Sequence, residues 1–84
     1  MVQITLELPE AAFSVLHQAP DEFARELRIA AAVKWYEVGR VSQGRGAEIA
    51  GLSRAAFIDA LSRYRVSPFQ YGEQELTEEL RDAD

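Results

Sequence analysis

Apolar and polar residues alternate strictly at the start of the chain, from Val2 to Leu8. Successive side chains of a strand point to opposite faces, so this period of two predicts a half-buried β-strand. Its inward positions would be Val2, Ile4, Leu6 and Leu8. Pro9 ends the predicted strand, because proline has no N–H group to donate to a sheet.

Two segments with helical spacing follow. Residues 10–18 predict a short helix, whose apolar positions are Ala12, Phe13 and Leu16. Pro20 stops that helix and suits the first position of the next one. Residues 21–38 predict the longest helix, with the apolar stripe Phe23, Leu27, Ala31, Trp35 and Val38. Gly39 then lies where a left-handed C-terminal cap is expected.

Residues 42–65 predict two short helices around a tight turn. Ser42 is a suitable N-cap for a first helix over residues 43–50. Gly51 supplies the positive φ that a sharp turn needs, and Leu52 would lie between the helices. Ser53 caps the second helix, which runs to about Arg65. The pair has the form of a helix-turn-helix.

The sizes of the side chains in this region favour the same interpretation. Ala47 is small where the second helix would cross the first, and Gly51 and Phe57 follow four and ten residues later. The inward positions of the second helix are Phe57, Ala60, Leu61 and Tyr64. Any tight pair of helices needs similar residues, so a plain helical hairpin stays open. The predicted fold is mainly α with a short N-terminal β-strand, a helical bundle containing a helix-turn-helix. The strand could pair with the extended residues 66–71 of the same chain or across a dimer.

Composition narrows the class of protein. The 84 residues make one small domain, and the absence of cysteine excludes disulfides and thiolate metal sites. No apolar run reaches the ~20 residues that cross a bilayer, and the start does not resemble a signal peptide. We therefore expect a cytoplasmic protein that contacts no membrane.

Charge is distributed unevenly along the chain. The net charge is −5, but residues 1–24 carry −4, residues 25–65 carry +4 and residues 66–84 carry −5. A basic centre between acidic ends suggests separate partners for separate segments. We divide the chain into a helix-turn-helix domain, residues 1–71, and an acidic partner-binding tail, residues 72–84.

A helix-turn-helix reads DNA with the start of its second helix, while flanking groups hold phosphates. Arg54 could reach a guanine edge, and the other arginines could pair with phosphates. The candidate DNA-binding residues are Arg40, Arg45, Ser53, Arg54, Ala55, Ile58, Arg63 and Arg65. Ile58 and Asp59 count against this interpretation, and Gly44 and Gly46 weaken the first helix.

The run from Glu37 to Arg54 resembles a family of short, uncharacterised prokaryotic proteins that are predicted helix-turn-helix antitoxins of type II toxin–antitoxin systems. That family has a Glu-x-Gly-Lys-Ile-Ser-x-Gly-Lys-Ala-Ala-Glu-Leu-Ala-Gly-Leu-Ser-Arg type of segment. Here Arg45 stands for a usual lysine, Gly46 replaces one of two usual alanines, and Ala56 stands where a polar residue is common.

The resemblance implies a homodimer that binds operator DNA and neutralises a partner nuclease toxin, often of a PIN-like class. The tail would fold over the toxin, with Leu76 and Leu80 in an apolar groove and Arg81 beside acidic groups of its active site. The implied partner-binding residues are Phe69, Tyr71, Leu76, Leu80 and Arg81.

Three other classes of protein compete with this interpretation. An enzyme is not expected, nor a cofactor or metal, because His17 has no nucleophile or acid cluster beside it. A ribbon-helix-helix dimer would read DNA with Gln3, Thr5 and Glu7 of the N-terminal strand. A protein-interaction module would show no salt-dependent binding of DNA. Trp35 and Tyr36 are expected in the core and not on an interaction surface.

Overall fold

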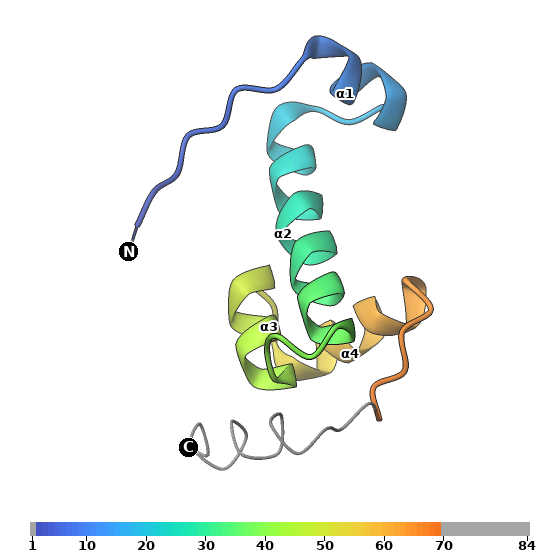
Figure 1. Cartoon of the computed structure of the whole chain (residues 1–84). Helices are drawn as coiled ribbons and strands as arrows, with labels where there is room; N and C mark the ends of the chain where they lie inside the picture. The colour runs from blue at the N-terminus through green and yellow to red at the C-terminus, as the bar shows by residue number, and fades with distance from the viewer. Residues whose placement is uncertain (1, 70–84) are drawn as a thin grey trace.

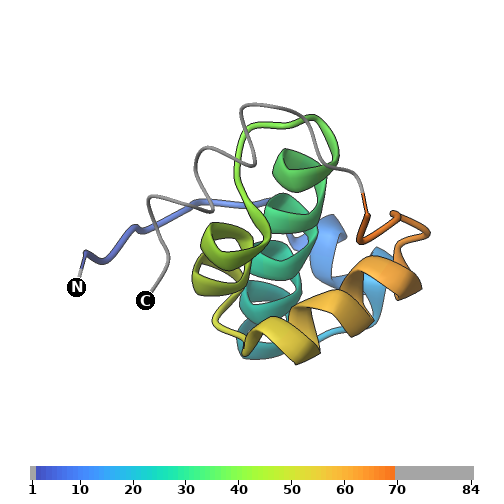
Figure 2. The same cartoon turned by 90° about the horizontal axis from the view of Figure 1, so that it is seen from below.

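The computed structural model describes residues 2–69, which form four helices and no β-strand. These are α1 (Glu10–Leu16), α2 (Pro20–Glu37), α3 (Gln43–Ala50) and α4 (Arg54–Arg63). The C-terminal half of α2 packs with α3 and α4 into a three-helix unit, and α1 lies at the opposite end of α2 (Figures 1 and 2).

The predicted N-terminal strand is wrong. Residues 2–9 form an extended segment, here called the arm, which pairs with no strand in the described chain. The arm extends away from α1 toward the N-terminus (Figure 1). Its alternating apolar side chains are exposed instead of half-buried, from 89% at Val2 to 42% at Leu8. A strand needs a neighbour for its N–H and C=O groups. Of residues 66–71, the predicted partner within the chain, the structure describes 66–69, which form no strand, and Val66 lies in the core.

All four described helices end in the same way. After the last helical turn one residue takes positive φ, and the N–H of the next residue donates to a carbonyl five residues earlier. Glycine takes that position after α2 (Gly39, φ 80°) and α3 (Gly51, φ 72°), as the sequence predicts. His17 (φ 54°) and Arg65 (φ 59°) take it after α1 and α4, where a Cβ atom makes the conformation less favourable.

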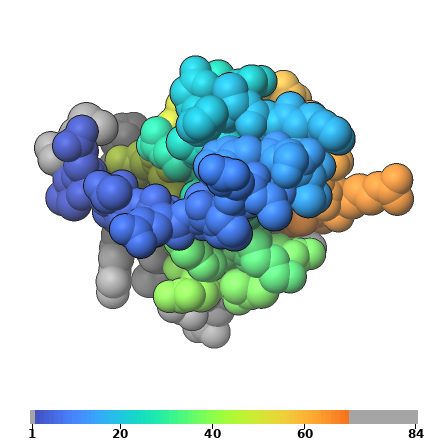
Figure 3. All heavy atoms as spheres, turned by 90° about the horizontal axis from the view of Figure 1, so that it is seen from above, coloured from blue at the N-terminus to red at the C-terminus, as the bar shows by residue number. Residues whose placement is uncertain are grey.

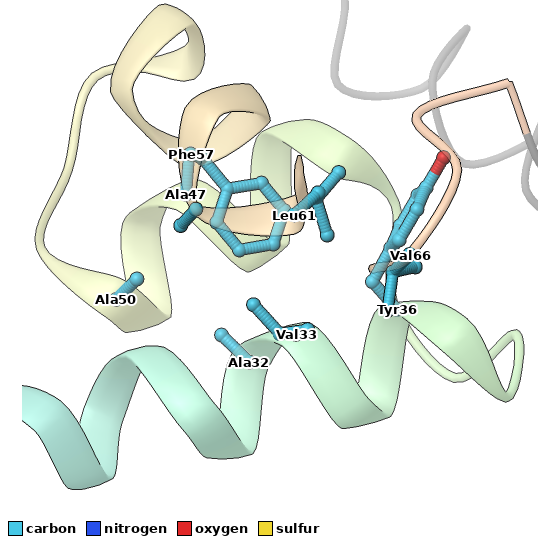
Figure 4. Close-up of a cluster of buried hydrophobic side chains, with 9 residues drawn as sticks. Ala32, Val33, Tyr36, Ala47, Ala50, Phe57, Leu61 and Val66 are labelled. Atoms are coloured by element: carbon cyan, nitrogen blue, oxygen red, sulfur yellow. The ribbon is translucent and has the colours of Figure 1, made fainter. Parts of the chain in front are cut away.

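The core lies between the C-terminal half of α2 and the helix pair (Figure 4). Phe57 and Leu61 of α4 are fully buried against Val33 and Tyr36 of α2, and the rings of Tyr36 and Phe57 meet edge to face at 6.1 Å. The buried apolar residues are Ala32, Val33, Tyr36, Ala47, Ala50, Phe57, Ala60, Leu61 and Val66. The inward positions predicted for Phe57, Ala60 and Leu61 are confirmed, whereas Tyr64 is 38% exposed.

The predicted buried stripe of α2 is also wrong, although Tyr36 is in the core as expected. Leu27, Trp35 and Val38 are 40%, 38% and 54% exposed, because α2 turns a different face to α3 and α4. That face carries Ile29, Ala32, Val33 and Tyr36, also at helical spacing. Ala32 on this face is fully buried. Since α2 is apolar on two sides, periodicity could not choose between them.

The first helix packs mainly against α2. The rings of Phe13 and Phe23 are 4.9 Å apart, and no residue of α1 is buried. Figure 3 shows this end of the molecule, where the arm and α1 lie on the surface.

Candidate nucleic-acid interface

The turn between α3 and α4 is built as the sequence predicts. At Gly51 the chain has φ of 72°, and the N–H of Leu52 donates to the carbonyl of Ala47 over 2.9 Å. The hydroxyl of Ser42 accepts from the N–H of Arg45, and that of Ser53 from the N–H of Ala56, both over 3.1 Å. Both helices therefore begin with a side-chain cap, and the turn fixes how α4 leaves α3.

The crossing of the two helices depends on Gly46. A Cβ atom on Gly46 would lie 2.6 Å from Cζ of Phe57, a distance that no ordinary contact allows. The Phe57 ring is fully buried, so moving it would displace the side chains packed around it. The sequence pattern assigns this role to Ala47 and treats Gly46 as a weakness of α3. Ala47 is buried beside the crossing, but Gly46 is where the ring touches the helix backbone.

A second contact was not expected from the sequence. Arg28 of α2 donates from Nε to the carbonyl of Ile49 over 2.8 Å and from Nη2 to the carbonyl of Glu48 over 3.4 Å. These carbonyls lie in the last turn of α3, where that of Glu48 also accepts from the N–H of Gly51 over 3.1 Å, and a cation at this end offsets the helix dipole. The guanidinium lies 3.0 Å from where a Cβ of Gly51 would be, so this turn is held from α2 as well.

The outward face of α4 is polar and small. Ser53, Ala55, Asp59 and Ser62 are exposed, and Ile58 is half-buried. Arg54 and Arg63 are nine positions apart, and a helix rotates by about 100° per residue. Their side chains therefore leave α4 on opposite sides of its outward face. The predicted DNA-binding residues of α4 thus surround one face of the helix, with a guanidinium on either side and the carboxylate of Asp59 between them.

The remaining arginines do not join this face as one cluster. Arg45 lies on the exposed side of α3, where it pairs with Glu48 over 2.8 Å. Arg40 lies at the corner between α2 and α3, with its guanidinium 5.9 Å from the centre of the Trp35 ring. Arg65 is exposed just beyond the end of α4.

Arg54 is anchored by a buried amide. Its Nε and Nη2 donate to Oε1 of Gln43 over 3.1 and 3.0 Å, and Gln43 is only 3% exposed. Nε2 of Gln43 donates to the hydroxyl of Tyr36 and to the carbonyl of Pro68, which also accepts from Tyr36 over 3.0 Å. Both sides of the amide are satisfied, so the network fixes one orientation for the guanidinium.

No sequence pattern singles out Gln43 or Arg28. Gln43 is the first residue of α3 and Arg54 the first of α4, eleven positions later. That both helix starts meet at one point becomes visible only in three dimensions.

Charge separates along the fold. Residues 39–69 carry five arginines against Glu48 and Asp59, a net charge of +3. Residues 2–38 carry three basic and six acidic side chains, a net charge of −3. An anion approaching the described chain is therefore attracted to the helix-turn-helix end.

Several expectations concern other parts of the chain. Phe69 is 80% exposed at the end of the described residues, whereas Tyr71, Leu76, Leu80, Arg81 and the rest of the tail lie outside them. Within residues 2–69 no three His, Asp or Glu side chains gather in a way that could hold a metal ion. In the same part of the chain, no helix combines the length and apolarity required to cross a membrane.

Comparison with known proteins gives a family. Residues 1–84 match the uncharacterised protein family UPF0175. One relative, a UPF0175 protein of Aeropyrum pernix, is 40% identical over 93% of this chain and 82% of its own length. A second UPF0175 protein of the same organism is 41% identical over 70% of this chain and 75% of its own length. No solved structure matches. With the whole sequence matched, the chain belongs to the UPF0175 family.

Proposed function

We propose that this protein is a DNA-binding antitoxin, which binds its own operator through α4 and neutralises a partner nuclease toxin through its acidic tail. It acts in the cytoplasm, as a homodimer, and uses no cofactor and no catalysis of its own. The observation that carries the proposal is the turn at Gly51, which joins two capped helices as a DNA-reading pair requires.

The surface around α4 supports DNA as the ligand. Arg54 and Arg63 flank its outward face, and the net charge of +3 at this end favours a polyanion. Arg54 is the candidate for reading a base, because the Gln43 amide holds its guanidinium in one orientation at the start of the helix. Arg63, Arg45, Arg40 and Arg65 are candidates for phosphate contacts. Asp59 suits a cytosine amine if it meets a base edge, and it is repelled by a phosphate.

The test of DNA binding is a mobility-shift assay with the DNA upstream of the gene, repeated over a range of salt concentrations. Binding should weaken linearly in log–log form as salt rises, because each neutralised phosphate releases counterions. Arg54→Ala should lower affinity at least about tenfold and relax the preference for one sequence. Arg63→Ala should weaken binding to all DNA sequences alike, and it should reduce the slope of log affinity against log salt concentration by about one.

Arg25→Ala is the matched control. Arg25 is an exposed arginine on α2, paired weakly with Asp21 over 4.0 Å and remote from α4 along the chain. Its loss removes the same charge without touching the proposed interface. An equal loss of affinity in the Arg25 and Arg54 variants would contradict the proposal, as would an affinity that does not change with salt concentration.

The antitoxin part of the proposal rests on the tail. Truncation after Tyr71 should abolish capture of the nuclease encoded next to this gene and leave the DNA shift intact. Loss of both activities together would contradict this division of roles. Capture that survives truncation would place the toxin contact elsewhere on the chain.

The ribbon-helix-helix alternative needs strands that pair between two chains, whereas residues 2–9 form no strand within the described chain, which favours α4 as the reading element. A module that binds only proteins keeps one favourable observation, the exposed apolar side chains of the arm and α2. Binding of the toxin without any shift of DNA would favour that alternative.

A further inference from the structure

Two apolar surfaces of this chain lie outside the core and are largely exposed within the described residues. The first is the arm, where Val2 and Ile4 are 89% and 80% exposed and Leu6 and Leu8 also face solvent. The second runs along α2 on the side away from the core and is called the α2 stripe. It consists of Leu27, Ala31, Trp35 and Val38, of which the three large side chains are between 38% and 54% exposed.

The spacing of the two surfaces matches. Alternate side chains of an extended chain are about 6.6 Å apart, and residues four apart on a helix rise by about 6 Å. The arm from Val2 to Leu8 spans about 20 Å. The stripe from Leu27 to Val38 spans about 16 Å. An extended arm lying along α2 can therefore place successive apolar side chains beside successive positions of the stripe.

The shapes of the stripe residues also suit an inserted side chain. Ala31 lies between Leu27 and Trp35 along the helix face, and its single methyl group is smaller than either neighbouring side chain. One face of the Trp35 ring is already covered by the Arg40 guanidinium at 5.9 Å. Lys34 lies three residues after Ala31 and four before Val38, so it lies on the same side of α2 as the stripe, and its Nζ pairs with Glu37 over 3.0 Å.

The polar residues of the arm fit the same placement. Gln3, Thr5 and Glu7 alternate with the apolar residues, so they face water when the apolar side lies on a helix. The arm lies apart from α2 of its own chain (Figure 1). No strand pairing is involved, since the contact is made by side chains alone.

We propose that the arm of one copy lies along the α2 stripe of a second copy, and that the second arm does the same in return. One chain carries both surfaces, so a reciprocal exchange covers all of them and closes with two-fold symmetry. A chain of 84 residues buries a modest core alone, and contiguous exposed apolar residues often mark an interaction surface. This interface goes beyond the proposed function, because it can form whether or not the protein binds DNA or a toxin.

Cross-linking between two differently tagged full-length chains tests the exchange. The natural chain has no cysteine, so Leu6→Cys in one chain and Ala31→Cys in the other introduce the only thiols. A short bismaleimide should join them into a covalent dimer that contains both tags. Val15→Cys replaces Leu6→Cys in the control, because Val15 is 73% exposed on α1 and belongs to neither surface. This control should give background only.

The other outcomes overturn the proposal. Background cross-linking in the mixture excludes the exchange, as does a chain carrying both cysteines that links only within itself. Efficient linking of Leu6→Cys to Leu6→Cys shows paired arms, and linking of Ala31→Cys to Ala31→Cys shows paired helices. Either product in place of the mixed one contradicts an arm on the stripe.

Sedimentation of the full chain in the absence of DNA gives an independent measurement. The unmodified protein should be a dimer, and Ile4→Glu should weaken it at least about tenfold, because a charge replaces a buried apolar group. Ile4 is exposed in the described chain, so this variant retains the fold, and circular dichroism checks its helix content. Val15→Glu should leave the dimer intact. A chain that stays monomeric at the highest attainable concentration, or a dimer unaffected by Ile4→Glu, overturns the proposal, and neither result bears on the DNA shift.

Discussion

The two halves of the described chain use apolar residues differently. About half of the residues are apolar both in the N-terminal half, residues 2–27, and in the helix-turn-helix half, residues 28–69. Yet every buried apolar residue lies between Ala32 and Val66, and most of the exposed large ones lie in the N-terminal half. Three helices surround a common space in one half, whereas α1 packs mainly against α2 in the other and buries no residue. Apolar content is therefore no measure of burial without elements to enclose it.

The largest expected difference between the halves comes from truncating an apolar side chain. Phe57→Ala should cost about 3–5 kcal/mol of unfolding free energy, because a fully buried ring leaves a cavity. In a domain this small, that loss can abolish cooperative unfolding. Val15→Ala on α1 should change stability by less than about 0.5 kcal/mol. Urea denaturation measures both, and similar losses would mean that the N-terminal half is packed more tightly than described.

A pair of glycine substitutions within α3 gives the next largest effect. Alanine favours a helix interior by about 1 kcal/mol over glycine, and Gly44→Ala should realise part of this gain, since its nearest neighbour is the Ser42 hydroxyl at 4.0 Å. Gly46→Ala should instead destabilise by about 1–3 kcal/mol, because its Cβ meets the Phe57 ring. Opposite shifts in Tm are expected. Two shifts of the same sign would show that the ring can move.

Substitution of two arginines of α2, one in each half, should give a smaller difference in unfolding free energy. Arg28→Met should cost about 1 kcal/mol, because it removes the hydrogen bonds to the last carbonyls of α3. Arg25→Met breaks only an exposed ion pair and should cost less than about 0.5 kcal/mol. Chemical denaturation measures the difference. If the Arg25 variant loses more, the contact from α2 to the turn contributes little.

The smallest effect concerns residues with positive φ. His17→Gly should stabilise the end of α1 by a few tenths of a kcal/mol, because glycine adopts φ of 54° without hindrance. Gly39→Ala should destabilise by about 1 kcal/mol through the backbone alone, since nothing lies within 4 Å of an added Cβ. Amide exchange in α1 reports the first change and thermal unfolding the second. Faster exchange after His17→Gly would contradict the expected relief.

Features decided by neighbouring residues could be predicted from the sequence. Ser42 and Ser53 cap helices, and Gly39 and Gly51 end them, because these effects depend on the backbone within a few positions. The bounds of the four helices are predictable for the same reason. The turn at Gly51, on which the candidate interface depends, belongs to this class, since the residues that form it are adjacent in the chain.

Features decided by distant residues could not be predicted. Two faces of α2 have apolar spacing, and only contact with α3 and α4 selects the one with Val33. Gly46 is explained by Phe57, and Arg54 is oriented by Gln43, in each case from eleven residues away. Alternation in the arm predicts a strand but identifies no single partner for it. The predicted strand is wrong, since residues 2–9 are extended and unpaired in the described chain.

The position of the single tryptophan has a practical consequence for spectroscopy. Trp35 lies outside the core at 38% exposure, whereas its neighbour Tyr36 is 1% exposed inside it. Its fluorescence emission is thus governed by what touches the back of α2 and by the guanidinium of Arg40, and only weakly by the packing of Phe57. A shift of that emission toward shorter wavelength, without a change in ellipticity, would indicate that a molecule has bound to α2 at Trp35 while the fold of the core is unchanged.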